Sequence, residues 1–372
     1  MKFTANNADF QRTLNKVGGV IPVRSTLPIL ENILFELLNN TLTLTATDME
    51  ISLTVSIQVK GSEDGSIAIP AKRLMDTIKA LPETASPKFT IDTTTNKIKI
   101  TTDNGEYALT GESAKEFPAV PQFKSTGEII IDNSSLKRII HRTAFAVSTD
   151  ELRPAMMGVL LQVKGNDMCA VSTDGHRLVK YIHKASKTGS LKRDIIIPAK
   201  ALQIVNRSIE GGDNTISIND THIRFTFDNT VLVSRLIDEN YPNYESVIPA
   251  DNTKELIVNR NSLVESIRRV ALYASATTHQ VRFDIKSGSL TVTAQDIDFG
   301  GEAKENITCE YKDDALEIGF NSTYVVDVLT HLDAEKVLFK FSSPTRAGVV
   351  SPVDPKAGEE VIMLVMPVRL NT

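Results

Sequence analysis

Three stretches of this sequence are variants of one another, and this triplication constrains the fold more than any single motif. A strand-like segment ends in an acid at three places, Asp48, Asp174 and Asp296. The interval of about 120 residues is too long for a solenoid repeat and is typical of a whole domain. The sequence therefore predicts three copies of one domain. We place them at residues 1–124, 125–250 and 251–372.

Two further marks recur in the same order. A helix-like segment precedes each acid, and we expect asparagine to cap it at Asn7, Asn133 and Asn261. A shared segment also follows each acid, centred on Ile69, Ile197 and Phe320. Three ordered marks at one period are hard to obtain by chance. Proline pairs in 117–121 and 241–249 stop helices and strands from continuing, so we interpret these segments as joints.

Each copy shows the same mixture of elements. Leu136, Ile139, Ile140 and Thr143 form an apolar stripe at helical spacing, whereas 41–47 alternates as a strand does. A second helix is expected after each Ile-Pro-Ala-Lys segment, and further strands follow it. The predicted fold class is α+β, with two helices packed on antiparallel sheets in each of three similar domains.

Composition excludes several classes of protein. No apolar run approaches the ~20 residues that span a bilayer, and the N-terminal segment lacks the apolar core of a signal peptide. Cys169 and Cys309 occupy non-equivalent places, which argues against a disulfide framework. No pair of ligand-type residues has a convincing metal spacing. We therefore expect a cytoplasmic protein without membrane contact, metal or cofactor.

Charge is distributed unevenly along the chain. The formal net charge is −5 at pH 7, which disfavours general affinity for nucleic acid. The predicted helices are nevertheless basic, as Lys137, Arg138 and Arg142 illustrate. Lys and Arg are good helix formers and could gather there for that reason alone, but Glu shares this property and is nearly absent from these helices. We favour a basic helical surface suited to phosphate.

Like domains joined head to tail keep one unmatched end at each terminus, and such ends either polymerise or close into a ring. Two chains would supply six domains and twelve inward-facing helices. At ~10 Å per helix the hole would be roughly 30 Å across, wider than duplex DNA. The sequence leaves the number of chains open at this point.

The ordered motifs resemble those of the bacterial sliding clamp family, the beta subunit of DNA polymerase III, along the whole chain. The resemblance implies a head-to-tail homodimeric ring that encircles duplex DNA independently of sequence. Such a ring tethers the replicative polymerase, the clamp loader and other clamp-motif proteins, and has no catalytic activity of its own. The segments that carry the resemblance are Met1–Phe3, Thr26–Leu30, Ala46–Asp48, Ser172–Leu178, Ile318–Asn321, Tyr324–Leu329 and Val365–Leu370.

The resemblance also implies a cleft between the second and third domains for short partner motifs that contain glutamine and spaced leucine or phenylalanine. The implied lining is Met156, Thr173, Gly175, His176, Arg177, Leu178, Pro242, Val247, Asn321, Tyr324, Met366, Pro367, Val368, Arg369 and Leu370. The chain departs from the family pattern at Ser246 and Thr278, where bulkier Arg and aromatic side chains can stand. We therefore expect a shallower cleft there. Asn371 and Thr372 extend past the usual terminal Leu and are expected in solvent.

Phosphate-directed contact with DNA is expected from loops and helices. The candidates are Arg24, Lys72, Arg73, Lys137, Arg138, Arg142, Arg153, Lys200, Arg207, Arg268 and Arg269. For the seam between two chains, the resemblance suggests Tyr107 and Leu109 of the first copy, meeting Leu272 and Tyr273 of the third.

Two other functions remain open at this stage. One is a scaffold that uses the same cleft but does not bind DNA. The other is a hydrolase that uses Ser172, Asp174 and His176. A catalytic triad is defined by geometry and usually draws its members from separated segments, which disfavours the hydrolase. Equivalent acids in the other two copies favour a structural role for Asp174, in which it accepts hydrogen bonds from turn amides.

Overall fold

The computed structural model describes residues 1–121, 124–165, 167–184 and 192–370, so the expectation for Asn371 and Thr372 lies outside the described residues. The α-helices are α1 Asn7–Gly18, α2 Ala71–Ala80, α3 Asn133–Thr143, α4 Ala199–Ser208, α5 Arg260–Val270 and α6 Ser322–Thr330. No helix in the described part of the chain is both long and apolar enough to cross a bilayer.

Short strands separate the helices in the first half of the chain. They are β1 Lys2–Thr4, β2 Asn32–Leu38, β3 Thr41–Thr47, β4 Ile51–Gln58, β5 Lys60–Glu63, β6 Gly65–Pro70, β7 Lys88–Asp92, β8 Lys97–Thr102, β9 Gly105–Thr110, β10 Gly127–Asp132, β11 Gly158–Lys164, β12 Asp167–Thr173 and β13 Arg177–His183.

The second half continues in the same manner. Its strands are β14 Lys192–Pro198, β15 Asp213–Ile218, β16 His222–Phe227, β17 Thr230–Arg235, β18 Lys254–Asn259, β19 Gln280–Lys286, β20 Ser289–Asp296, β21 Gly301–Thr308, β22 Leu316–Asn321, β23 Lys336–Phe341, β24 Gly348–Pro352, β25 Glu359–Val365 and β26 Pro367–Val368. Every recorded strand pair is antiparallel. This confirms the predicted α+β fold class.

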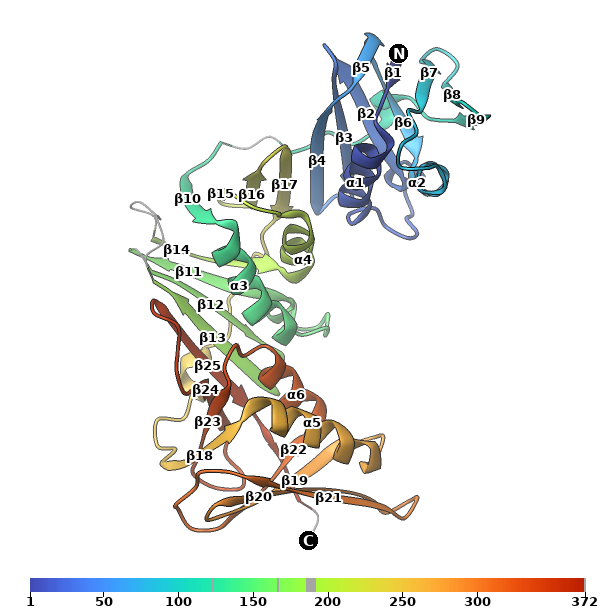
Figure 1. Cartoon of the computed structure of the whole chain (residues 1–372). Helices are drawn as coiled ribbons and strands as arrows, with labels where there is room; N and C mark the ends of the chain where they lie inside the picture. Colours follow the sequence, from blue (N-terminus) through green and yellow to red (C-terminus); the bar gives the residue numbers. More distant parts are fainter. Residues whose placement is uncertain (122–123, 166, 185–191, 371–372) are drawn as a thin grey trace. The chain divides into compact units, whose positions relative to one another are not determined.

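The chain divides into two compact units, and neither coincides with one predicted domain. Unit 1 consists of Met1–Leu136 and Lys200–Leu236. It holds a five-stranded sheet in the order β5-β1-β7-β8-β9 and an eight-stranded sheet in the order β10-β15-β16-β17-β4-β3-β2-β6. In this unit α1 packs beside α2 and contacts β3 and β4 (Figure 1).

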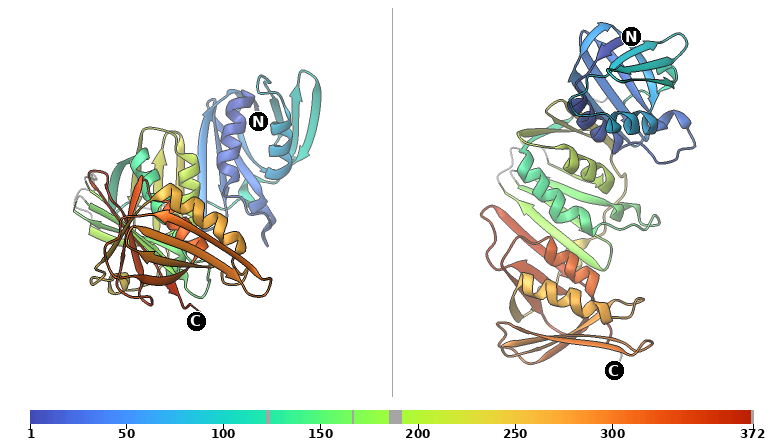
Figure 2. Two further views of the ribbon diagram at one scale, coloured as in Figure 1. Left: turned by 60° about the horizontal axis from the view of Figure 1, so that its bottom comes forward. Right: turned by 45° about the vertical axis from the view of Figure 1, so that its right-hand side comes forward.

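Unit 2 consists of Lys137–Ala199 and Ile237–Thr372. Its eight-stranded sheet has the order β14-β11-β12-β13-β25-β24-β23-β18, and its five-stranded sheet has the order β21-β20-β19-β22-β26. Both views of Figure 2 keep α5 (orange) beside α6 (red), and α6 also contacts β25. The second sequence copy therefore contributes strands to both units, because each eight-stranded sheet continues from it into a neighbouring copy.

Alternating apolar residues build the core, as the sequence predicted. Leu42, Leu44 and Ala46 on β3 are all fully buried. In unit 1 the Phe3 and Phe89 rings stack with centroids 4.6 Å apart, and Phe10 and Phe35 meet them edge-on or tilted. Such aromatic contacts add to the free energy of burial, so this cluster ties β1, β2, β7 and α1 together.

The asparagines expected as helix caps have another role. Asn6 caps α1 by accepting a hydrogen bond from the Asp9 amide, and Asn259 caps α5 by accepting one from the Ser262 amide. Asp132, which precedes α3, accepts a hydrogen bond from the Ser135 amide. The predicted caps at Asn7, Asn133 and Asn261 are therefore wrong. Asn7 is fully buried and donates from Nδ2 to the Pro82 carbonyl over 2.9 Å.

The same connection is made in all three copies. The first helical residue donates to a carbonyl near the end of the second helix: Asn7 to Pro82, Asn133 to Gly211 and Arg260 to Leu332. The main-chain amide of the same residue also donates to a carbonyl in the segment after the second helix, at Ala85, Gly212 and Glu335. In the first two copies an asparagine side chain joins the two helices of the repeat, and in the third copy Arg260 makes this connection.

Candidate functional site

One turn recurs three times and confirms the structural role predicted for its acid. Asp48 Oδ1 accepts hydrogen bonds from the main-chain amides of residues 50 and 51. Asp174 does the same for 176 and 177, and Asp296 for 298 and 299. A short carboxylate that binds the amides two and three positions ahead stabilises a turn between two strands.

In the middle copy this turn presents side chains of its own. Gly175 has a φ of +91°, which favours glycine, and it places His176 and Arg177 next to α6. The His176 ring stacks on Tyr324 with centroids 5.5 Å apart. The turn therefore connects β12 and β13 to the second helix of the third copy.

Arg177 is fixed by several partners at once. Its Nε donates to Asp174 over 3.1 Å, another guanidinium nitrogen donates to the Phe145 carbonyl over 2.9 Å, and Asp327 forms an ion pair with it. The guanidinium also lies over the rings of Phe145 and Tyr324 at 5.2 and 5.1 Å. Only 11% of its side chain is exposed, so Arg177 holds the turn rigidly.

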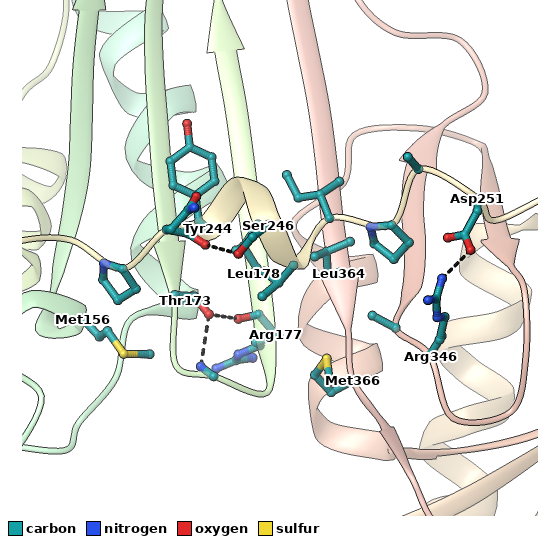
Figure 3. A pocket seen from close by; sticks show the side chains of 18 of the residues that line it. Met156, Thr173, Arg177, Leu178, Tyr244, Ser246, Asp251, Arg346, Leu364 and Met366 are labelled. Atoms are coloured by element: carbon teal, nitrogen blue, oxygen red, sulfur yellow. Dashed lines mark hydrogen bonds and ion pairs between the residues drawn. The ribbon is translucent and has the colours of Figure 1, made fainter.

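A cavity of about 620 Å³ opens beside this turn, wholly within unit 2 (Figure 3). Its floor is apolar, and it lies between the turn, the segment 242–251 and the hairpin connection at 345–347. It is lined by eight of the predicted residues: Met156, Thr173, Gly175, Arg177, Leu178, Pro242, Val247 and Met366. Thr173 Oγ1 accepts from the Gly175 amide and donates to the Arg177 carbonyl, which keeps this edge of the cavity in place.

The remaining predicted cleft residues are His176, Asn321, Tyr324, Pro367, Val368, Arg369 and Leu370, and the cavity lining does not include them. Asn321 instead caps α6, accepting from the amides of Thr323 and Tyr324. Pro367 and Val368 form β26 and pair with β22. Leu370 packs over Gly319, where an added Cβ would lie 2.7 Å from Leu370 Cδ2.

Sequence reasoning missed several lining residues. They are Asn243, Tyr244, Ile248, Pro249, Ala250, Asp251, Thr345, Arg346, Ala347 and Leu364. The proline pair at 242 and 249 had suggested a joint, and the same prolines make this segment a wall of the cavity. The 345–347 connection has no periodic pattern, so nothing in its sequence signalled the cavity.

The two departures from the family pattern lie in different places. Ser246 lines the cavity and donates from Oγ to the Asn243 carbonyl over 2.8 Å, so its hydroxyl is bound to its own segment. Thr278 lines a separate cavity of about 450 Å³ together with Gln280 and Arg282.

The three residues of the hydrolase hypothesis face different partners. Ser172 is fully buried and donates from Oγ to the Thr143 carbonyl over 2.6 Å. Asp174 binds turn amides and Arg177, and His176 stacks on Tyr324. This geometry does not place His176 between the hydroxyl and the carboxylate, as a triad requires.

Most of the predicted DNA-contacting residues fall into two groups. Arg24, Lys72, Arg73, Arg207 and Arg268 are exposed, and no carboxylate among the described residues lies within ion-pair distance of them. Lys137 is half-buried. Several others are paired with acids: Arg138 with Glu359, Arg153 with Asp150, Lys200 with Asp48 and Arg269 with Glu305.

Arg142 differs from both groups because it is only 5% exposed. It donates to the His331 carbonyl and lies 3.5 Å from Asp333 Oδ2. Burial lowers the pKa of this guanidinium, although Asp333 and Glu359 oppose the shift. These contacts join α3 to the segment at the end of α6, so the guanidinium of Arg142 is bound to groups inside unit 2.

A basic cavity of about 340 Å³ lies between α1 and α4 in unit 1. Arg12, Lys16 and Arg207 line it, and Lys16 lies 3.3 Å from Glu210. The sequence prediction included only Arg207 of these three. The spacing of Arg12 and Lys16 on one helix face could have identified them, since residues four apart are neighbours on a helix.

The predicted seam residues lie at sheet edges. Tyr107 and Leu109 belong to β9, and Leu272 and Tyr273 precede β19 in a short 3₁₀ helix that contacts β21. Leu272 is 82% exposed, whereas Leu109 is only 8% exposed. Within the described residues β9 and β21 each have one strand neighbour, so each leaves a free edge.

Comparisons with known proteins cover the whole chain. The descriptions that match are DNA polymerase III beta subunit, N-terminal domain at residues 1–121, central domain at 130–243 and C-terminal domain at 245–369. The "Beta sliding clamp" of Chlamydia muridarum is 31% identical over 375 residues, and that of Escherichia coli K12 is 28% identical over 373, each covering 100% of both chains.

Solved structures agree with the sequence comparisons. A sliding clamp from Bartonella birtlesii bound to griselimycin has a TM-score of 0.94 at 29% identity, and the Pseudomonas aeruginosa clamp has 0.91 at 30%. Both alignments cover 100% of both chains. With its three repeated turns, its continuous sheets and these full-length matches, the chain belongs to the DNA polymerase III beta subunit family of sliding clamps.

Proposed function

We propose that two copies of this chain close into a homodimeric ring around duplex DNA and act as a polymerase processivity factor. The ring tethers the replicative polymerase, the clamp loader and other replication and repair proteins through the cleft in unit 2. It works in the cytoplasm and catalyses no reaction itself. The observation that carries this proposal is that consecutive copies join by pairing equivalent strands. Within the described residues, the same pairing leaves one edge of such a strand unpaired in the first copy and one edge of its complement unpaired in the third.

Both junctions between consecutive copies are made by equivalent pairs of strands. In unit 1, β17 of the second copy pairs with β4 of the first, and Ser234 lies opposite Ile51. In unit 2, β25 of the third copy pairs with β13 of the second, and Val365 lies opposite Arg177. Ile51 and Arg177 each follow the acid of the repeated turn in their own copy by three positions, so the two registers are equivalent.

The rule predicts the third junction. The strand equivalent to β17 and β25 in the first copy is β9, and the strand equivalent to β4 and β13 in the third copy is β21. Each of these two strands ends its sheet and has one strand neighbour within the described residues. An open edge presents unpaired amides and carbonyls and is a template for another chain. Antiparallel pairing of β9 with β21 of a second copy closes the series without a new kind of contact.

The hairpin registers also specify which residues meet. The turn after Asp296 is two residues longer than the turns after Asp48 and Asp174, because Asp296 pairs with Gly301; Gly301 is therefore the equivalent of Ile51. Carrying the register of β17 on β4 over to β9 then places Leu109 opposite Gly301, Tyr107 opposite Ala303 and Glu106 opposite Lys304 of the second copy. Tyr107 would then approach the exposed Leu272 and Tyr273. The opposite charges of Glu106 and Lys304 favour this register, because a directly opposed pair contributes about 0.2–1 kcal/mol.

DNA contact is proposed for the exposed cations Arg24, Lys72, Arg73, Arg207 and Arg268, with Lys137 and the ion-paired Arg138, Arg153, Lys200 and Arg269 as secondary contributors. Arg12 and Lys16 join Arg207 in the basic cavity. Arg142 is left out because its charge is held inside the protein. Such cations bind phosphates without reading sequence, which lets a ring slide.

The cleft is proposed as the site for partner segments. An apolar floor with Met156 and Met366 adapts to leucine and phenylalanine side chains, and its polar rim can bind an extended main chain.

The domain limits 1–124, 125–250 and 251–372 stay part of the proposal, since the compact units divide the second copy.

The seam can be tested by mass in solution. We expect twice 40.8 kDa by sedimentation equilibrium, and a weaker dimer for Glu106→Lys because like charges would then face each other. Lys304→Glu should restore association in the double variant by about two- to fivefold at each seam. Lys88→Glu, on the interior strand β7, is the control and should leave the mass unchanged. A monomeric wild type, or a double variant no better than Glu106→Lys, contradicts the proposed seam.

A further inference from the structure

One end of the cleft carries charged side chains that a partner motif of glutamine and apolar residues would have no charged group to pair with. Arg346 and Asp251 both line the cavity and form an ion pair with each other (Figure 3). Apart from these two and Arg177, every lining residue is apolar or uncharged. The charge therefore lies where a bound segment would leave the apolar floor.

Arg346 is the accessible cation of this lining. Arg177 is held by Asp174, Asp327 and the Phe145 carbonyl, and its side chain is only 11% exposed. The Arg346 side chain is 55% exposed, and Asp251 is its partner. A ligand carboxylate can reach the Arg346 guanidinium without disturbing the turn that Arg177 supports.

The position of Arg346 is fixed by the main chain around it. Asn252 is 9% exposed and donates from Nδ2 to the carbonyls of Lys340 and Ala347, both over 2.9 Å. The Arg346 amide also donates to the Ser343 carbonyl. Asn252 thus fastens the segment that carries Asp251 to the turn that carries Arg346. The main chain that carries the guanidinium therefore need not become ordered when a segment binds.

The Arg346–Asp251 pair is weak enough to be exchanged. Both side chains are more than half exposed, and such surface pairs contribute about 0.2–1 kcal/mol. A carboxylate on a segment lying across the apolar floor would be shielded from water, which strengthens its attraction to a guanidinium. Ser246 cannot supply this charge, although the family can place Arg at that position.

We propose that Arg346 selects partner segments that carry an acidic side chain next to their apolar residues, and that Asp251 holds the guanidinium until such a segment binds. The inference rests on the proposed role of the cleft as a peptide site. It assigns the partner chemistry to one residue of this chain, and it predicts that neutral or basic flanks bind less well.

The test uses the full-length protein and short fluorescein-labelled peptides with one glutamine, two leucines and a phenylalanine. Aspartate or asparagine is placed at each remaining position in turn, and binding is followed by fluorescence anisotropy. At one position or more, we expect the aspartate peptide to bind about fivefold more tightly than its asparagine twin, with the difference shrinking at high salt. Asp251→Asn should widen the difference because it removes the competing carboxylate.

Arg346→Glu should abolish the preference and favour lysine in place of aspartate. Lys340→Glu is the matched control, because Lys340 forms a similarly exposed pair with Glu255 but does not line the cavity. It should keep the aspartate preference. Equal affinity for aspartate and asparagine peptides at every position, or an unchanged preference in Arg346→Glu, overturns the proposal for Arg346 alone. If no peptide binds any variant, the peptide site itself is contradicted, and this inference with it.

Discussion

His331 shows how one half-buried side chain can make stability depend on pH. Its ring stacks on Phe145 at 3.8 Å and lies 4.7 Å from the His141 ring. Burial lowers the pKa of His331, and the nearby charges of His141 and Arg177 act in the same direction. The Asp327 carbonyl and carboxylate oppose the shift without reversing it. The folded protein therefore favours the neutral imidazole.

The sign of the pH effect follows from this shift. An unfolded histidine has a pKa of about 6.5, so below that pH the unfolded chain binds a proton more readily than the folded one. The stabilisation is complete above this value and is lost as the pH falls towards the lower folded pKa. Melting temperatures at pH 7.5 and 5.5 should therefore differ less in His331→Asn than in the wild type. His279→Asn, at an exposed ring, serves as the control. An equal drop in His331→Asn and the wild type would contradict this account.

At the scale of secondary structure, the hydrogen bond from Asn7 to the end of α2 is the contact that each repeat reproduces. Asn7→Ala removes the hydrogen bonds that Nδ2 donates to the carbonyls of Ile78, Leu81 and Pro82. Gln11 and main-chain amides still donate to these carbonyls, so we expect a cost of about 0.5–1.5 kcal/mol for each bond lost. Asn6→Ala removes only the cap of α1, typically about 1 kcal/mol. Hydrogen exchange should accelerate in residues 78–85 of Asn7→Ala, whereas Asn6→Ala should affect mainly the first turn of α1. The reverse pattern would restore asparagine to a capping role.

Secondary-structure elements also show which features the sequence could predict and which it could not. Alternation predicted β3, and the apolar stripe from Leu136 to Thr143 predicted α3. Both depend on local side-chain pattern, which a sequence displays directly. The role of Asn7 was missed because its partner lies 75 residues away. Arg346 was missed for a related reason, since an irregular connection acquires its neighbours only in the folded protein.

At the scale of the whole molecule, the period of the sequence correctly indicated three similar copies. It did not indicate that β4–β17 and β13–β25 pairing would merge neighbouring copies into continuous sheets. Strand pairing between distant segments has no signature in either segment alone, so only the structure reveals this rule. The rule makes ring closure a repetition of a junction that the chain already uses twice.

Retention on DNA after loading by a cognate clamp loader tests directly whether the protein forms a closed ring around the duplex. A nicked circular plasmid is compared with the same plasmid cut once, at moderate salt. We expect stable retention on the circle and rapid loss from the linear form, because a closed ring leaves only at an end. Equal retention on both forms would show ordinary surface binding and would contradict a ring around duplex DNA.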